Sequence, residues 1–282
     1  MKVLKIIPLV LIALAMIACS FTVNVPTVNT GVVRTLEISE AAVNSTGTNE
    51  VIIEMGAGTL KISAGAEQLV EGTVRHNVET WEPTISRSND ELRIIQRSNS
   101  NIGIPDGDIK NDWTLMFGDY PIDLTLNAGA YEGNLDLSGL AITNLSISDG
   151  ASKATVEFKS LNPVKMEELN YKTGASDVEL LGLGNANVSD IYFDSGVGSF
   201  TLDFSGDLQN DINVRANSGM SDMTIVIPST AQARIIVNGG LSNVDASGTW
   251  TITGSTYTCG DSGPMITINL DMAVGNLNLR QE

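Results

Sequence analysis

The sequence predicts an all-β protein whose main part is a β-solenoid, a stack of coils of about 22 residues each. Eight segments share one template, in which apolar residues alternate on both sides of a central small residue. Alternation turns side chains to one face of a strand, so each segment is expected to form a strand, a turn and a strand. The central glycines from Gly129 to Gly240 are 21, 24, 22, 23 and 21 residues apart. No comparable stretch sustains the 3.6-residue period of a helix.

The central residues of the eight copies are Gly56, Gly129, Gly150, Gly174, Gly196, Gly219, Gly240 and Ala273. The copy around Gly196 is the clearest, and the copy around Gly240 is the weakest because only Val244 continues its apolar pattern. Glycine at these turns would permit positive φ and the close approach of neighbouring turns. A β-sandwich is the alternative, since short strands with frequent turns suit it too. Neighbour pairing separates the two folds, because a solenoid stacks equivalent strands in parallel.

Residues 1–18 are expected to be a lipoprotein signal peptide. Lys2 and Lys5 precede an uncharged apolar run of 13 residues, 6–18, which is shorter than the roughly 20 residues that span a bilayer. The sequence Met16-Ile17-Ala18-Cys19 resembles the bacterial lipobox. That resemblance implies cleavage before Cys19, a diacylglyceryl thioether on its sulfur, and acyl chains such as palmitate as the anchor. Two or more chains are needed, since one gives only marginal membrane binding.

The rest of the chain is divided by its pattern. Residues 19–35 are expected to form a tether, and residues 36–98 a small N-terminal β domain. That domain includes the first template copy, a strand at 70–78 and a hairpin around Ser88-Asn89-Asp90. Residues 99–112 are polar, contain two glycines and a proline, and are predicted to be a boundary loop. Residues 113–282 form the repetitive solenoid, in which only residues 164–169 could make a single helical turn.

Three segments resemble the bacterial toast-rack proteins. Residues 51–62 (Val-Ile-Ile-Glu-Met-Gly-Ala-Gly-Thr-Leu-Lys-Ile) are similar to their N-terminal domain, and residues 76–83 to its Asn-Val…Trp-x-Pro segment. Residues 113–115, residues 121–124 and the Gly-Ala-rich coils resemble the remainder, so the resemblance covers about residues 35–282. It implies an envelope location and a β-solenoid related to provisionally named adhesins and to domains of cell-wall antibiotic-response proteins. These families have no established catalytic residues, so the resemblance assigns none.

Charge and residue usage exclude several classes of function. Without residues 1–18 the chain has 33 acidic and 14 basic side chains, a formal charge of −19, which repels nucleic acid and anionic headgroups. With Cys19 modified, Cys259 is the only other cysteine, so neither an intramolecular disulfide nor a thiolate metal cage is possible. His76 is the only histidine, which excludes a histidine pair, and we expect it at the surface or in a hairpin.

Residues 259–264 (Cys-Gly-Asp-Ser-Gly-Pro) resemble the nucleophile segment of chymotrypsin-like serine proteases. They lack the second glycine before the proline, and an oxyanion hole depends on that loop geometry. His76 also lacks the family's histidine frame, and residues 260–263 fit a turn before a strand at 266–270. Glycosidases need two positioned carboxylates, but nothing in the sequence distinguishes such a pair among its 33 acidic residues. We therefore expect no enzyme activity.

Two further groups of side chains could bind ligands. Asp106, Asp108, Asn111 and Asp112 are oxygen donors in the boundary loop, but their spacing departs from the EF-hand, so a solvated loop without metal is expected. Trp81 and Trp113 are expected to cover an open end of the solenoid. Trp250 and Tyr257 fall in the long insertion between the last two copies, where binding loops tend to lie. They are the candidate ligand contacts.

The sequence thus predicts a non-enzymatic surface lipoprotein outside the cytoplasm, anchored by Cys19 to the cell membrane or an outer membrane. It would act as an adhesion or binding module for a protein or glycan partner, without a cofactor and without binding nucleic acid. The alternative, suggested by the family alone, is a sensory or regulatory component of the envelope stress response. An adhesin should bind material outside the cell, whereas a stress component should co-purify with a membrane-embedded signalling protein.

Overall fold

The computed structural model describes residues 27–44, 47–96, 104–106 and 108–282. The predicted signal peptide, Cys19, about half of the predicted tether and part of the predicted boundary loop lie outside these residues. No helix among the described residues is long and apolar enough to cross a membrane.

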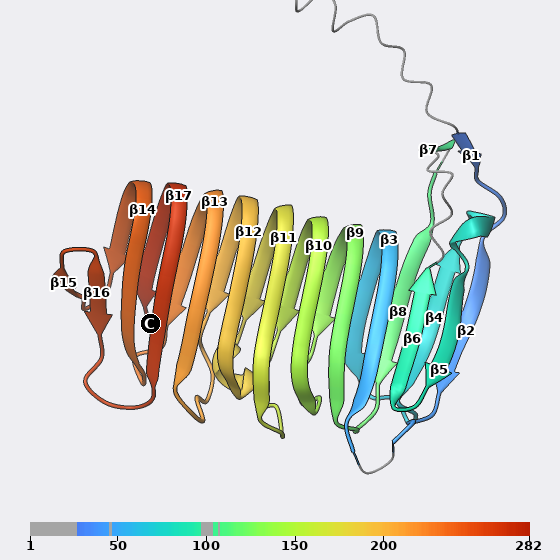
Figure 1. The fold of residues 1–282 in the computed structure, drawn as a ribbon, viewed down its shortest axis with the longest axis horizontal. Helices are drawn as coiled ribbons and strands as arrows, with labels where there is room; N and C mark the ends of the chain where they lie inside the picture. Colours follow the sequence, from blue (N-terminus) through green and yellow to red (C-terminus); the bar gives the residue numbers. More distant parts are fainter. Residues whose placement is uncertain (1–26, 45–46, 97–103, 107) are drawn as a thin grey trace, which may run out of the picture.

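Within the described residues, eight long bent strands stand side by side in one stack (Figure 1). In spatial order they are β3 (Asn49–Ala64), β9 (Ile122–Asp136), β10 (Ile142–Glu157), β11 (Met166–Leu181), β12 (Val188–Asp203), β13 (Ile212–Ile227), β17 (Met265–Gln281) and β14 (Gln232–Ser247). Neighbouring strands pair in parallel over nearly their whole length. The central residues align within the pairing, so equivalent positions of the template stack on one another. Parallel, in-register stacking confirms the β-solenoid and is not the pairing of a β-sandwich.

Each long strand consists of a leading half before the central residue and a trailing half after it. The halves form two layers that face each other, with the turns along one edge and the loops between coils along the other (Figure 1). The interior between the layers is apolar: Ile191, Phe193 and Phe200 of β12 are at most 2% exposed. Ile191 pairs with Leu169 on one side and with Val214 on the other. Burying one such side chain stabilises by about 1.5–3 kcal/mol, so these stacked rows are the main source of stability.

The central glycines form a column along the turn edge, and close stacking explains them. A Cβ on Gly174 would lie 2.4 Å from the carbonyl oxygen of Gly150, and one on Gly196 would lie 2.4 Å from that of Gly174. Neither glycine has a positive φ. Of the two reasons predicted for glycine at these turns, the close approach of neighbouring turns applies here and positive φ does not. Ala273 occupies the same column between Gly219 and Gly240.

The strand order departs from the chain order at the C-terminal end. β17, the last strand of the chain, lies between β13 and β14, so β14 is the outermost long strand. The hairpin of β15 (Thr251–Thr253) and β16 (Thr256–Cys259) then pairs antiparallel with the leading half of β14. This explains the weak template copy around Gly240: β14 packs against a full coil on one side only, whereas β17 packs on both.

At the N-terminal end each layer continues separately beyond β3. The trailing layer is extended by β8 (Asn111–Phe117), β4 (Val70–His76) and β2 (Arg34–Glu40), with β4 antiparallel to both of its neighbours. The leading layer is extended by β6 (Glu91–Gln96) and β5 (Pro83–Ser88). β5 and β6 form the predicted hairpin, with Asn89 at positive φ in its turn. The short strands β1 (Thr27–Asn29) and β7 (Ile104–Asp106) pair with each other.

Two sequence-based expectations change on this fold. Residues 164–169 form no helical turn, since β11 begins at Met166 and its register with β12 extends the strand there. The short helical segments lie elsewhere, in the 3-10 turns η2 (Glu79–Trp81) and η3 (Leu183–Ala186). β3, from the predicted N-terminal domain, pairs with β9 of the repeats along both halves. The division into two domains stays a prediction.

Candidate binding surfaces

The protease-like segment and the histidine are far apart. Ser262 lies in the turn between β16 and β17, at one end of the stack, whereas His76 ends β4 at the other (Figure 1). His76 is 1% exposed and its Nδ1 lies 2.9 Å from the carbonyl oxygen of Val78. The expectation that His76 is a surface or hairpin residue was therefore wrong, because it continues the inward row of β4 begun by Val70 and Val74. A Ser–His pair cannot form between these positions.

Cys259 is buried beside this turn and is a free thiol. Cys259 is 7% exposed. Burial raises the pKa of its thiol to about 11, although a backbone hydrogen bond from Ala233 acts to lower the pKa. A thiol with so high a pKa is protonated at neutral pH and is a weak nucleophile. Cys259 is therefore a packing residue of the C-terminal end.

Two of the oxygen-rich boundary residues, Asn111 and Asp112, have side chains engaged within the sheet, whereas Asp108 is exposed. Asn111 donates to the carbonyl of Ala57 at 2.6 Å, and its Oδ1 accepts from the indole of Trp113 at 2.9 Å. Asp112 accepts from the hydroxyl of Thr59 at 3.0 Å. Over the residues that are described, no group of three or more acidic, histidine or cysteine side chains is arranged to hold a metal ion.

Trp250 and Tyr257, the candidate ligand contacts, lie at the C-terminal end of the stack. Both are partly buried and pack against the core beyond β14. The indole N–H of Trp250 donates to the carbonyl of Ser247 at 2.9 Å, and Tyr257 aligns with Ile235 in the β14–β16 pairing. These aromatics thus help to cover the open end. Trp113 is fully buried in β8, between β3 and β4, and its predicted role in covering the other end stays a prediction. Ligand contact by Trp250 or Tyr257 stays a prediction.

A buried polar cluster lies inside the turn edge, beneath the glycine column. The Asp149 carboxylate accepts hydrogen bonds from Tyr171 at 2.9 Å, from Thr173 at 2.5 Å and from Ser176 at 3.3 Å. Burial raises the pKa values of both Tyr131 and Tyr171. The hydroxyl of Tyr171 also faces Tyr131 and Asp149, which raises its pKa further. A buried carboxylate needs such donors to offset its lost hydration. The cluster is closed by its own contacts, so we assign it to the stability of the turns.

An exposed apolar row lies outside the same edge, which we call the ridge. It consists of Val197, Met220 and Val274, whose strands β12, β13 and β17 are neighbours and whose positions are paired. They are 53%, 59% and 37% exposed, respectively. Because contiguous exposed apolar patches can mark interaction sites, the ridge is a candidate binding surface.

A shallow trench of about 560 Å³ runs beside the ridge. Its polar side is the paired row Asp194, Asn217, Asp271 and Asn238. The amide of Asn217 donates to the carboxylate of Asp194 at 2.7 Å, and the backbone of Gly219 and Ala273 lies between this row and the ridge. The carboxylates of Asp194 and Asp271 thus lie three residues before the apolar Val197 and Val274 of their strands, on one exposed edge. Such a surface is a candidate for association with another molecule.

The family follows from comparison with known sequences. The sequence model of the N-terminal domain of toast-rack proteins (DUF2154) matches residues 29–167 and 160–226. The chain belongs to the toast-rack family. The matched region of this toast-rack chain begins near β2 and runs through β13, so it includes both the N-terminal extension and most of the coils.

Solved structures similar to this toast-rack chain include a protein of Clostridium sporogenes ATCC 15579 that is provisionally named a cell adhesion protein. It is 20% identical, with a TM-score of 0.48 over 89% of this chain and 100% of that one. A provisionally named adhesin from Parabacteroides merdae ATCC 43184 is 11% identical, with a TM-score of 0.43 over 89% and 99%. No curated protein matches the toast-rack chain.

The ridge was missed in the sequence, although a signal for it was present. Val197, Met220 and Val274 each follow directly after the central small residue of a template copy. At the same place the copies around Gly129, Gly150 and Gly174 have alanine. Because the template was built on positions that face the core, an apolar residue at the turn itself had no assigned role.

Proposed function

We propose that this toast-rack chain is a non-enzymatic binding module of the bacterial envelope, held to a membrane by lipid on Cys19. The observation that carries the proposal is the ridge, three exposed apolar side chains beside the carboxylates of the trench. The stack behind it is rigid, since each coil is paired along its length. Rigid presentation lowers the entropy lost on binding, which favours a preformed contact surface.

The chemistry of the ridge and trench points to a protein partner. Apolar side chains flanked by Asp194 and Asp271 complement a surface that has both apolar and basic side chains. The chain as a whole has a formal charge of −17, so a basic partner would also be attracted from a distance. An adhesin role is compatible with this surface, and the lipobox resemblance at Cys19 supports an extracytoplasmic location.

The test is a crosslinked pull-down from intact cells that compares the native protein with two variants. Met220→Glu places a charge at the centre of the ridge, and Val32→Glu places one at another highly exposed apolar residue, 81% exposed at the opposite end. We expect a partner exposed outside the cell to be lost with Met220→Glu and kept with Val32→Glu. Equal capture by both variants would contradict the ridge as the binding surface. Capture of a membrane-embedded signalling protein would favour the stress-response alternative over adhesion.

The anchor has its own test. Cys19→Ala should move the protein from the membrane fraction to the soluble extracytoplasmic fraction, because one residue holds the acyl chains. If the variant stays with the membrane, Cys19 does not supply the anchor.

A further inference from the structure

A second hollow lies on the outer face of the trailing layer, away from the ridge, with a volume of about 590 Å³. Three of the chain's 16 basic side chains line it: Arg75 of β4, Lys61 of β3 and Lys153 of β10. The carboxylates of Asp112 and Glu132 line it as well. The hollow therefore has a formal charge of +1 (three cations and two carboxylates), on a molecule with a formal charge of −17.

The three cations lack ion pairs of the kind formed by Arg34, Arg87, Arg93 and Lys159. Across the described parts of the chain, Lys61, Arg75 and Lys153 have no carboxylate oxygen within 4.0 Å. Asp112 instead accepts a hydrogen bond from Thr59. The three cations are thus available to an external anion.

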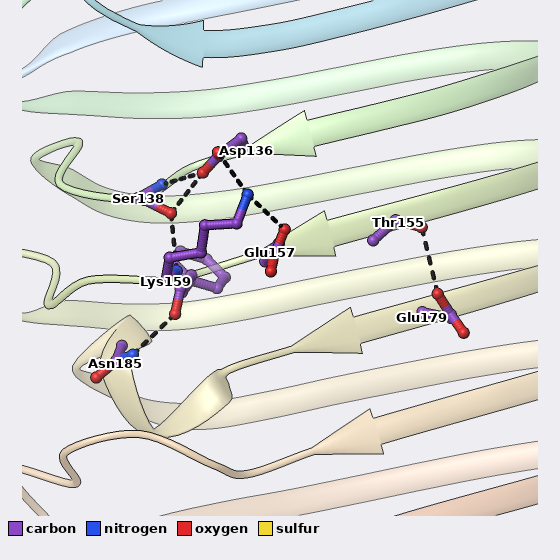
Figure 2. A network of polar contacts seen from close by, with 8 residues as sticks. Asp136, Ser138, Thr155, Glu157, Lys159, Glu179 and Asn185 are labelled. Atoms are coloured by element: carbon purple, nitrogen blue, oxygen red, sulfur yellow. Dashed lines mark hydrogen bonds and ion pairs between the residues drawn. The ribbon is translucent and has the colours of Figure 1, made fainter.

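Lys159, on a neighbouring loop, shows the contrast (Figure 2). Its ammonium lies 3.0 Å from Asp136 and 2.9 Å from Glu157. Partial burial acts to raise the pKa of Asp136, but hydrogen bonds from Ser138 and Lys159 outweigh it and hold the pKa below its usual value. Hydrogen bonds to Glu157 and Asp136 raise the pKa of Lys159. A lysine that has two carboxylate partners in this way has little to offer an added anion.

Register sets the spacing of the free cations. One row of paired positions crosses the five strands β4, β8, β3, β9 and β10. In that order its residues are Arg75, Asp112, Thr59, Glu132 and Lys153. Lys61 lies two residues along β3 from Thr59, on the same outer face. Each cation is therefore two strands from the next, about 10 Å across the sheet, and the two-residue offset of Lys61 brings the backbone separation to about 12 Å. Two extended sugar rings span a similar length, so a charge on every second sugar would meet successive cations.

The remaining lining suits sugar hydroxyls. Thr114, Asn134 and Thr155 form one outward row with Lys61, because their positions are paired across β8, β3, β9 and β10. They offer hydroxyl and amide groups that both donate and accept hydrogen bonds. The hydroxyl of Thr155 donates to Glu179 at 3.4 Å, at the margin of the hollow (Figure 2).

We propose that this hollow binds an acidic polysaccharide, one whose alternate sugars have carboxylates, lying across β4, β8, β3, β9 and β10. Arg75, Lys61 and Lys153 hold successive carboxylates, and the threonine and asparagine side chains bind the hydroxyls between them. The inference rests on the proposed binding function but concerns a different face from the ridge, so the two can fail separately.

The test is isothermal titration of the full chain in detergent with an octasaccharide of alternating uronic acid and N-acetylhexosamine. We expect saturable binding that weakens as salt is raised, since the cations are exposed. Lys61→Ala should weaken the affinity roughly tenfold, the loss expected for one charge-assisted hydrogen bond. Lys172→Ala is the matched control, because Lys172 is an exposed lysine on the leading half of β11, outside the hollow. It should bind as the native protein does.

Several outcomes would overturn the proposal. No heat of binding with the acidic octasaccharide would overturn it, as would equal affinity for a neutral oligomer of N-acetylglucosamine. Tighter binding of inorganic polyphosphate than of the sugar would show a simple phosphate site. An equal loss in Lys61→Ala and Lys172→Ala would show unspecific charge attraction. If Met220→Glu still abolishes the cellular partner while the octasaccharide fails to bind, only this inference fails.

Discussion

At the scale of single residues, the glycine column sets how closely the coils approach. Gly174 has an ordinary φ, yet a Cβ there would lie 2.4 Å from the carbonyl oxygen of Gly150. Adding that methyl group forces the backbones apart, and overpacking of this kind costs about 1–3 kcal/mol. We expect Gly174→Ala to lower the free energy of unfolding by that amount in a urea titration. Ala175→Ser, at the next and exposed position, is the control and should change it by less than about 0.5 kcal/mol. Equal stability of the native protein and Gly174→Ala would contradict the steric reason.

Cys259 offers a second test at the residue scale. Its pKa of about 11 lies above the ordinary value of 9.0, so at pH 8 the folded protein has far less thiolate than the unfolded chain. Because the thiolate is the nucleophile, iodoacetamide should alkylate Cys259 much more slowly in the folded protein than in urea. Mass spectrometry of timed samples measures both rates. As the pH approaches 11 the rate in the folded protein should rise. A fast folded-state rate at pH 8 would show that the thiol is neither buried nor protonated.

At the scale of elements, buried asparagines hold the loops between coils. Asn162 is fully buried; its amide donates to the carbonyls of Ile142 at 2.8 Å and Ala186 at 3.1 Å. It also accepts from the backbone N–H of Ile142 at 3.2 Å. One side chain thus joins the starts of three successive coils.

Removing that side chain should cost more than a surface change does. Asn162→Ala leaves buried backbone groups without partners, at about 1–3 kcal/mol for each group. We expect its melting temperature to fall by several degrees, measured by circular dichroism. Asn278→Ala, on the outer face of β17 where it is partly exposed, is the matched control. A melting temperature equal to that of the control would contradict the bridging role.

The strand pattern was readable in the sequence, but the arrangement of the strands was only partly so. The alternation of apolar and polar residues identified β12 and its neighbours, because every second side chain of a strand faces the core. It could not place β17 between β13 and β14, since the pattern records which face is buried and not which neighbour covers it. The weak apolar pattern around Gly240 reflects the position of β14 at the end of the stack. Likewise Arg75, Lys61 and Lys153 are distant in the sequence, and only the register of β4, β8, β3, β9 and β10 brings them to one hollow.

At the scale of the whole molecule, stability should vary along the stack. Each coil contacts only its neighbours, so the protein approximates a one-dimensional array. β11 is paired along both sides by β10 and β12. Among the described residues, the trailing half of β14 has a paired strand on one side only, β17. Its inner side chains Val244 and Ala246 are also only partly buried. Opening this half exposes few apolar groups, whereas opening β11 must separate two interfaces.

Hydrogen exchange should therefore reveal a gradient. We expect the amides of residues 243–247 to exchange at least tenfold faster than those of residues 176–180 at the equivalent place in β11, because partial opening at an edge needs less free energy than global unfolding. Mass spectrometry of peptic fragments measures this, with a urea-unfolded sample to set the rates of the open chain. Met220→Glu should leave the gradient unchanged, since that side chain is exposed, and it thereby separates loss of binding from loss of structure. Equal protection in both segments would instead show that the stack opens as one unit and that the hairpin of β15 and β16 closes its end completely.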